Sequence, residues 1–125
     1  MKSGLVIYSA QLDKLMRFYG EVFGLELKEH DRGYALLEDD DFELVILETE
    51  TARSLGVNSE GIPSPRDATA IKPAFFISTS LADISAQVKA YGGGLHAPKD
   101  WTFGGRWVCD AWDCEGNIFQ LRGEL

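Results

Sequence analysis

The chain has 125 residues, enough for one domain that buries a hydrophobic core without disulfide bonds or a structural metal. Hydrophobic residues make up 45% of it and charged residues 26%, as is typical of globular proteins. The formal net charge of −8 argues against nucleic acid as a partner, because phosphates require a positive surface. A negative charge is compatible with a cationic small molecule, and it also serves solubility alone.

The hydrophobic pattern and the spacing of the cysteines favour the cytoplasm as the cellular compartment. No apolar run reaches the length of a membrane-spanning helix, and residues 1–4 lead into a short strand and not into a signal peptide. Cys109 and Cys114 are five positions apart, which suits neither a zinc site nor a disulfide framework. We therefore expect a cytoplasmic protein with two free thiols.

The first half of the chain predicts one helix among four strands. The strands are predicted at residues 5–8, 25–29, 33–38 and 42–48, and the helix at residues 11–23. The first strand is apolar throughout, which indicates that both of its faces are covered. The helix has an apolar stripe formed by Leu12, Leu15, Met16, Tyr19 and Phe23. Gly24 follows in the position where helix ends favour glycine, so the first half has the order β-α-β-β-β.

Residues 51–70 interrupt this pattern. The segment contains Gly56, Gly61, Pro63 and Pro65, with polar residues between them and no sustained period. A stretch of about 20 residues without secondary structure is long for a compact domain. The segment is therefore either a linker or a lid over a site, and we favour the linker.

The second half repeats the order of the first. A strand is predicted at residues 73–78, a helix at 81–91, a short strand at 95–96, an aromatic segment at 101–103 and a hairpin at 106–122. Ser80 and Asp83 have the spacing of a helix-capping box, and three glycines at 92–94 end the helix. The two helices begin 69 positions apart, at Leu12 and Leu81.

The repeat predicts how the two halves are arranged. A module of this kind usually cannot bury the hydrophobic face of its sheet by itself, so two modules pack together. We predict a single α+β domain over residues 1–125, in which two paired β-α-β-β-β modules form a curved mixed sheet around a cavity. The first module covers residues 1–50, the linker 51–70 and the second module 71–125.

The hairpin at residues 106–122 contains the clearest local signals. In its turn at 113–117, the Asp113 side chain can cap the backbone and Gly116 can adopt a positive φ. In the strand that follows, one face carries Ile118, Gln120 and Arg122, and the other carries Phe119 and Leu121. We expect a ligand on the face that ends in polar groups.

Two motifs resemble those of a known superfamily. Leu12-Asp13, followed by Phe18-Tyr19 and Val22-Phe23-Gly24-Leu25, resembles the first-helix signature of the vicinal oxygen chelate superfamily, the glyoxalase, bleomycin-resistance and extradiol-dioxygenase group. The run Asp113-x-x-Gly116-Asn117-x-x-x-Leu121 resembles the superfamily's D-P-x-G-N turn, with Cys114 in place of the usual proline. The resemblance implies that the two modules form a glyoxalase/bleomycin-resistance-like fold.

The resemblance also implies four metal-ligand positions, on the first and fourth strands of each module, which are usually His, Gln or Glu. Here they fall at Gly4, Glu43, Lys72 or Pro73, and Gln120. Glycine and proline have no ligating side chain and an ammonium only donates, so two oxygen ligands remain, too few for a tight metal site. The two histidines, His30 and His96, lie outside these positions. We therefore predict no metal and no other cofactor.

Strand alternation indicates the ligand-binding residues. Tyr8, Glu43, Gln120 and Arg122 share the inward face with the metal-ligand positions. Apolar walls are predicted from Val6, Val45, Leu47 and Ile118. The alternative for Gln120 and Arg122 is a solvated face near the chain end.

Aromatic residues near the hairpin are further ligand candidates. Trp101, Phe103, Trp107 and Trp112 could stack on a planar or cationic ligand, and the first two are favoured because glycines flank their irregular segment. Trp107 and Trp112 differ in parity, so they face opposite sides of their strand and one of them belongs to the core. The alternative role for these rings is core packing or a dimer interface.

Three functional hypotheses follow. The leading one is a metal-free small-molecule-binding homodimer, similar to the bleomycin-resistance-type binders, that sequesters an aromatic or cationic compound. The alternative is a lyase, isomerase or dioxygenase of the same superfamily, dependent on a divalent metal with non-standard ligands that include Glu43, Gln120 and His96. A third is an interaction module in which the aromatic residues form only an interface.

Overall fold

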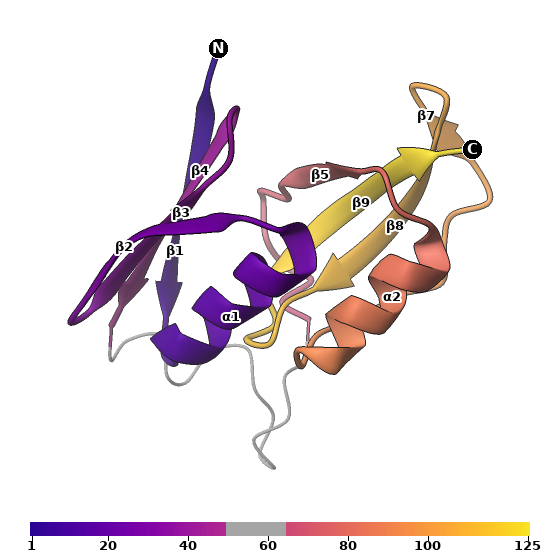
Figure 1. The fold of residues 1–125 in the computed structure, drawn as a ribbon. Coiled ribbons are helices and arrows are strands. Elements are labelled where there is room, and N and C mark those ends of the chain that lie inside the picture. Colours follow the sequence, from indigo (N-terminus) through magenta and orange to yellow (C-terminus); the bar gives the residue numbers. More distant parts are fainter. Residues whose placement is uncertain (50–64) are drawn as a thin grey trace. The chain divides into compact units, whose positions relative to one another are not determined.

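The computed structural model describes residues 1–49 and 65–125, which belong to two compact units, Met1–Leu55 and Gly56–Leu125 (Figure 1). Most of the predicted linker, residues 51–64, lies outside the described residues. Of the two helices in the described part of the chain, neither combines the length and the apolar character that crossing a bilayer requires.

The first unit is a four-stranded mixed sheet with one helix. Its elements are β1 (Ser3–Ser9), α1 (Leu12–Phe23), β2 (Glu26–Asp31), β3 (Tyr34–Glu38) and β4 (Phe42–Glu48). The strand order is β1-β4-β3-β2, with β1 parallel to β4 and the other pairs antiparallel. All five predicted elements of this half are present, and their ends differ from the predicted ones by at most two residues.

The helix α1 covers one face of this sheet (Figure 1). Its buried side chains are Leu12, Leu15, Phe18, Tyr19 and Val22. The predicted stripe is therefore wrong at Met16 and Phe23, which are only half-buried, because the buried face turns toward Phe18 and Val22. Gly24 ends the helix in the left-handed conformation with φ 68°, as predicted.

The prediction that the first strand is covered on both faces is wrong. Ile7 and Ser9 are buried, whereas Val6 and Tyr8 on the opposite face are 53% and 59% exposed. Strand alternation separates these two pairs, and α1 covers only one face. The first unit thus has an exposed apolar surface.

The second unit repeats this arrangement. Its elements are β5 (Ala74–Ile77), α2 (Leu81–Ala90), β6 (Gly94–Leu95), β7 (Thr102–Phe103), β8 (Arg106–Trp112) and β9 (Ile118–Glu124). The strand order is β5-β9-β8-β6, with β7 also paired to β8, and β5 is parallel to β9 as β1 is to β4. The predicted α+β class is confirmed, and the two-residue strand β7 is an addition to the predicted order. The cavity between modules stays a prediction.

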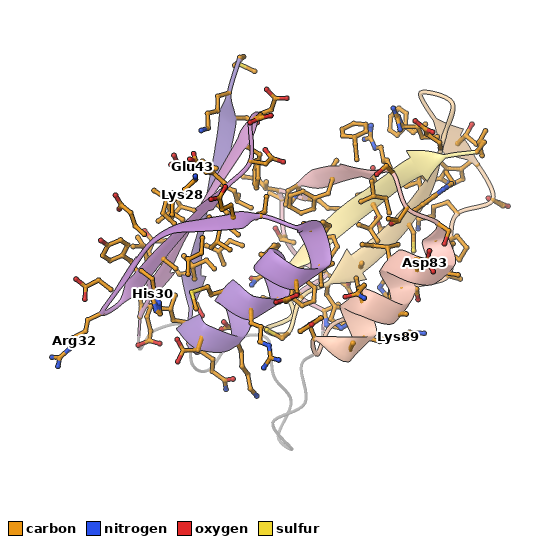
Figure 2. All side chains as sticks on the ribbon, in the orientation of Figure 1. Lys28, His30, Arg32, Glu43, Asp83 and Lys89 are labelled. Carbon is orange, nitrogen blue, oxygen red and sulfur yellow. The ribbon has the colours of Figure 1, made fainter. Side chains whose placement is uncertain are left out.

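The predicted signals at both ends of α2 are confirmed. Ser80 Oγ accepts a hydrogen bond from the Asp83 amide at 3.0 Å. At the other end, the amides of Gly92 and Gly93 donate to carbonyls of the last turn, and Gly92 has φ 94°, the geometry of a Schellman motif. Asp83 and Lys89 lie at opposite ends of the helix and complement its dipole (Figure 2).

The turn at residues 113–117 is built around a buried carboxylate. Asp113 Oδ1 accepts hydrogen bonds from the amides of Glu115 at 2.9 Å and Asn117 at 3.0 Å, and Asn117 Nδ2 donates to Asp113 Oδ2 at 2.9 Å. Gly116 has φ 83°. The predicted cap and the predicted glycine conformation are both confirmed. Cys109 and Cys114 are both buried, and burial raises the pKa of the Cys109 thiol.

Two tryptophans of β8 lie across glycines of the neighbouring strands. Trp107 lies over Gly123 of β9, and Trp112 lies over Gly94 of β6. A Cβ atom at either glycine would overlap the indole ring, so a residue with a side chain would displace the tryptophan. The β8–β9 register has no shift between the two tryptophans, so they face opposite sides of β8, as predicted.

Candidate functional site

One candidate surface is the sheet face of the first unit opposite α1, here called the Tyr8 face. It carries Gly4, Val6, Tyr8, Glu43, Val45 and Leu47. The register pairs Gly4 with Glu43, Val6 with Val45 and Tyr8 with Leu47, and paired residues share a face. The structure thus brings together the predicted binding residues Tyr8 and Glu43 with three predicted apolar wall residues.

The Tyr8 face has a charged end. Glu38 of β3 pairs with Glu43 of β4, and Lys2 Nζ lies 2.7 Å from Glu38 Oε2. The hydrogen bond from Lys2 lowers the pKa of the Glu38 carboxyl, and the same bond raises the pKa of Lys2. Figure 2 shows Glu43 at the end of this unit opposite to His30 and Arg32. On β1 and β4 the centre of the Tyr8 face is therefore apolar, with the charged group of Lys2, Glu38 and Glu43 at one end, while Glu29 and Asp31 lie on the same face along β2.

The second candidate surface is the sheet face of the second unit opposite α2, here called the Arg122 face. It carries Ala74, Phe76, Arg106, Val108, Asp110, Trp112, Ile118, Gln120, Arg122 and Glu124. Phe119 and Leu121, which alternate with the β9 members of this set, are fully buried on the other face. The predicted separation of Gln120 and Arg122 from Phe119 and Leu121 is confirmed.

A chain of hydrogen bonds connects the polar side chains of the Arg122 face. Arg122 Nε donates to Gln120 Oε1 at 2.8 Å, and Gln120 Nε2 donates a longer bond to Asp110 Oδ1 at 3.5 Å. Asp110 Oδ2 lies 3.0 Å from Lys72 Nζ and 3.6 Å from Lys99 Nζ. Both ends of the Gln120 amide are thus engaged by neighbouring side chains.

The surroundings of Asp110 keep its carboxyl ionised. Burial raises the pKa of this carboxyl, but the hydrogen bond and charge of Lys72, the Gln120 amide and the charge of Lys99 together outweigh burial. The pKa of Asp110 therefore lies below its ordinary value of 3.8. At neutral pH the group holds two ammonium side chains and one amide on this face.

Exposed aromatic rings surround the two arginines of the Arg122 face. The Arg122 guanidinium lies 4.7 Å from the Phe103 ring centroid and 5.4 Å from that of Phe76. The Arg106 guanidinium lies 5.3 Å from the Phe76 centroid. Trp101 meets Phe103 edge to face, with 6.1 Å between ring centroids. Phe76, Phe103 and Trp101 are 62%, 55% and 47% exposed, so their rings could accept a ligand.

Trp107 does not lie with the other predicted binding residues. Its ring covers Gly123, on the sheet face that also carries Cys109 and Leu121. Trp112 is the tryptophan of β8 on the Arg122 face, and His96 lies against it with 4.9 Å between the ring centroids. Strand parity separates the two tryptophans but does not indicate which of them shares a face with Gln120 until the β8–β9 register is known.

Sequence reasoning missed several members of the Arg122 face: Phe76, Lys99, Arg106 and Asp110. Alternation within β5 separates Phe76 from the buried Phe75, which contacts Phe119, but the sequence contains no signal that pairs Phe76 with Arg122. The sequence identifies Lys72 only as a position without a metal donor, and it contains no signal that Lys72 pairs with Asp110. The pairing of Asp110 with Gln120 depends on the β8–β9 register.

The residues at the superfamily's metal-ligand positions do not fit a metal ion. Gly4 pairs with Glu43 in the first unit, and Ala74 pairs with Gln120 in the second. The residue opposite Gln120 is thus Ala74, one or two positions beyond the predicted Pro73 or Lys72, and alanine also lacks a ligating side chain. A Cβ atom at Gly4 would lie 3.1 Å from the Glu43 carbonyl oxygen, which leaves little room for a larger side chain.

Other potential metal ligands are not grouped in the described parts of the chain. Over residues 1–49 and 65–125 no set of three or more His, Cys, Asp or Glu side chains is placed to hold a metal ion. His30 Nε2 lies 3.8 Å from Asp13 Oδ1, and His96 Nε2 lies 3.8 Å from Asp67 Oδ1, both at exposed positions. No step of a reaction is therefore assigned to a metal.

The fold, in contrast to the site, has clear counterparts among solved structures. A glyoxalase/bleomycin resistance protein/dioxygenase family enzyme from Burkholderia phytofirmans PsJN has a TM-score of 0.73 at 17% identity, covering 98% of this chain and 97% of that one. The fosfomycin resistance protein FosX from Listeria monocytogenes has a TM-score of 0.72 at 16% identity, covering 100% and 91%. A glyoxalase-related enzyme from Fulvimarina pelagi has a TM-score of 0.72 at 19% identity, covering 99% and 88%.

The sequence comparisons add no closer relative. No protein-family model matches the sequence, and no curated protein matches it. The structural similarities confirm the glyoxalase/bleomycin-resistance-like fold that the two sequence motifs predicted.

Proposed function

We propose that this chain, which has the fold of the glyoxalase/bleomycin resistance/dioxygenase proteins, binds an aromatic small molecule without a metal ion. The observation that carries the proposal is the donor set at the superfamily's metal positions. Gly4 and Ala74 supply no ligand, and the Gln120 amide is bonded to Arg122 and Asp110. The same sheet faces keep the exposed rings and polar groups that small-molecule sites use.

The charges of the Arg122 face favour the aromatic alternative over the cationic one. Lys72, Lys99, Arg106 and Arg122 outnumber the two carboxylates of this face, Asp110 and Glu124. A cationic ligand would be repelled there, whereas a planar ring could stack on Phe103 and Trp101. The similarity to a fosfomycin resistance protein supports a role in resistance to a small molecule.

The test is a fluorescence titration of the purified protein with planar aromatic compounds, in the presence and absence of a chelator. We expect saturable quenching of tryptophan emission that the chelator does not change. Quenching should weaken in Trp101→Ala, because Trp101 lies 6.1 Å from Phe103 on the proposed binding surface. The purified protein could instead contain a stoichiometric divalent metal ion whose removal abolishes ligand binding or an enzymatic activity. That result would favour the metal-dependent lyase, isomerase or dioxygenase.

We also propose that the protein is a homodimer and works in the cytoplasm. Support for the dimer comes from the large apolar side chains that stay exposed in both units, Val6 and Tyr8 in the first and Phe76, Trp101 and Phe103 in the second. Association would remove part of this surface from water.

A further inference from the structure

We infer that the Arg122 face binds the oxyanion of an aromatic acid, a carboxylate or a phosphate group, through the guanidinium groups of Arg122 and Arg106. The inference rests on the proposed function, since it names the class of aromatic compound that this face selects. It begins with the distribution of charge. The chain has a net charge of −8, yet this face gathers four cations against two carboxylates.

Of the four cations on this face, the two lysines have a carboxylate partner within the described parts of the chain and the two arginines do not. Lys72 and Lys99 both lie beside the Asp110 carboxylate, at 3.0 Å and 3.6 Å. Arg122 donates through Nε to the neutral Gln120 amide. Among the residues that the structure describes, no carboxylate forms an ion pair with Arg122 or Arg106. The two guanidinium groups are therefore the cations available to a ligand.

The two guanidinium groups are also held in place before a ligand arrives. Both lie over the Phe76 ring, at 5.3 Å and 5.4 Å from its centroid, and Arg122 lies over Phe103 as well. Stacking and the Gln120 hydrogen bond restrict the rotamers of Arg122, which lowers the entropy lost on binding. Two like charges on one ring repel each other, and an oxyanion bound to both would remove that repulsion. Planar guanidinium groups match the geometry of carboxylate and phosphate oxygens.

The exposed rings beside the two arginines favour a ligand whose acidic group is attached to an aromatic ring. Phe103 contacts Arg122, and Trp101 meets Phe103 edge to face, so an aromatic body could stack there while its acidic group reaches the guanidinium groups. The neutral amide of the same compound would make the stacking contacts without the charge. The Arg122 face should therefore distinguish an aromatic acid from its amide.

The experiment compares 1-naphthoate and 1-naphthyl phosphate with the isosteric neutral 1-naphthamide by tryptophan quenching. We expect at least one acid to bind about tenfold or more tightly than the amide, and this preference to weaken as salt is added. In Arg122→Gln the ratio of the acid affinity to the amide affinity should fall toward one. Arg106→Gln provides a second, independent variant, and unchanged urea midpoints verify that each variant is folded.

Arg32→Gln is the matched control, because it removes an exposed arginine at the β2–β3 turn of the first unit (Figure 2). It should change neither affinity. Equal binding of acids and amide to the wild type, or an acid preference that survives in both Arg122→Gln and Arg106→Gln, overturns this inference and leaves the proposed function standing. Absence of saturable quenching by all three compounds overturns both.

Discussion

Asp110 is the residue that organises the charges of the Arg122 face. Its carboxylate lies 3.0 Å from Lys72 Nζ and 3.6 Å from Lys99 Nζ. It also accepts a hydrogen bond from Gln120 Nε2, and Gln120 Oε1 accepts a hydrogen bond from Arg122 Nε. Lys72 precedes β5, Lys99 follows β6, and Gln120 lies on β9, so one side chain of β8 connects three other segments. Removing its charge should affect stability and also the orientation of Gln120.

Asp110→Asn is expected to lower the free energy of unfolding at neutral pH by about 1 kcal/mol, the size of a partly exposed ion pair with its hydrogen bond. Because the pKa of Asp110 is lower in the folded state than its ordinary value of 3.8, the ionised carboxylate stabilises the fold above that value. This stability is lost as the pH falls through the folded-state pKa. Urea unfolding at a series of pH values between 7 and 3 should therefore show wild type and variant converging below a pH of about 4.

Asp100→Asn is a suitable control, because it removes one charge from an exposed position next to Lys99. Its effect should be small at every pH, as for most surface substitutions. A difference between wild type and Asp110→Asn that stays constant or grows on acidification would contradict the assigned role of Asp110.

At the scale of elements, two glycine–tryptophan pairs join the strands of the second unit. The Trp107 ring of β8 lies over Gly123 of β9, and the Trp112 ring lies over Gly94 of β6. The absence of a side chain at each glycine lets a large ring lie flat on the neighbouring strand. The first pair stabilises the face covered by α2, and the second pair lies on the Arg122 face beside His96.

Gly123→Ala should destabilise the protein by about 2 kcal/mol, because the new methyl group would overlap the Trp107 indole. In a Trp107→Leu background the same substitution should cost less, since the smaller side chain can move away. The measurement is a double-mutant cycle of urea midpoints. Gly20→Ala in α1 is the matched control: its Cβ would lie 3.6 Å from Leu37 Cδ2, an ordinary contact, so helix propensity should leave stability unchanged or raise it by up to about 1 kcal/mol. Equal costs of Gly123→Ala in both backgrounds would exclude the proposed overlap.

At the scale of the whole molecule, the chain is a structural repeat whose halves have diverged in surface chemistry. Each unit pairs its first strand in parallel with its last and follows the first strand with a helix. The Tyr8 face is apolar at its centre, whereas the Arg122 face is rich in cations. Both faces leave large apolar side chains exposed.

The exposed apolar side chains lead to the prediction that the protein is a dimer. Size-exclusion chromatography with light scattering should give about twice the 13.8 kDa mass of one chain. A mass of one chain over the whole concentration range would contradict the dimer. If Trp101→Ala dissociates the dimer and no aromatic compound quenches the wild type, the interaction-module hypothesis replaces the proposed function.

Local sequence signals were sufficient wherever a residue acts on its chain neighbours. Gly24 and Ser80 end and begin helices as predicted, and Asp113 caps its turn, because these contacts lie within a few positions. Counting along the chain did not indicate that Ala74 lies opposite Gln120, because this pairing depends on strand register. Counting back from the helix assumes equal connections, but Gly4 precedes α1 by eight positions and Ala74 precedes α2 by seven.

The sequence by itself determined the order of elements, their caps and which alternate residues of a strand share a face, because these depend on period and on short-range contacts. Only the tertiary structure decided which charges meet. The net charge of −8 is compatible with a cationic ligand and indicates solubility more than a ligand, because net charge is a sum over the chain, whereas a binding surface depends on register. Strand pairing brings Lys72, Asp110 and Arg122 to one face from distant parts of the sequence, and that face is cationic.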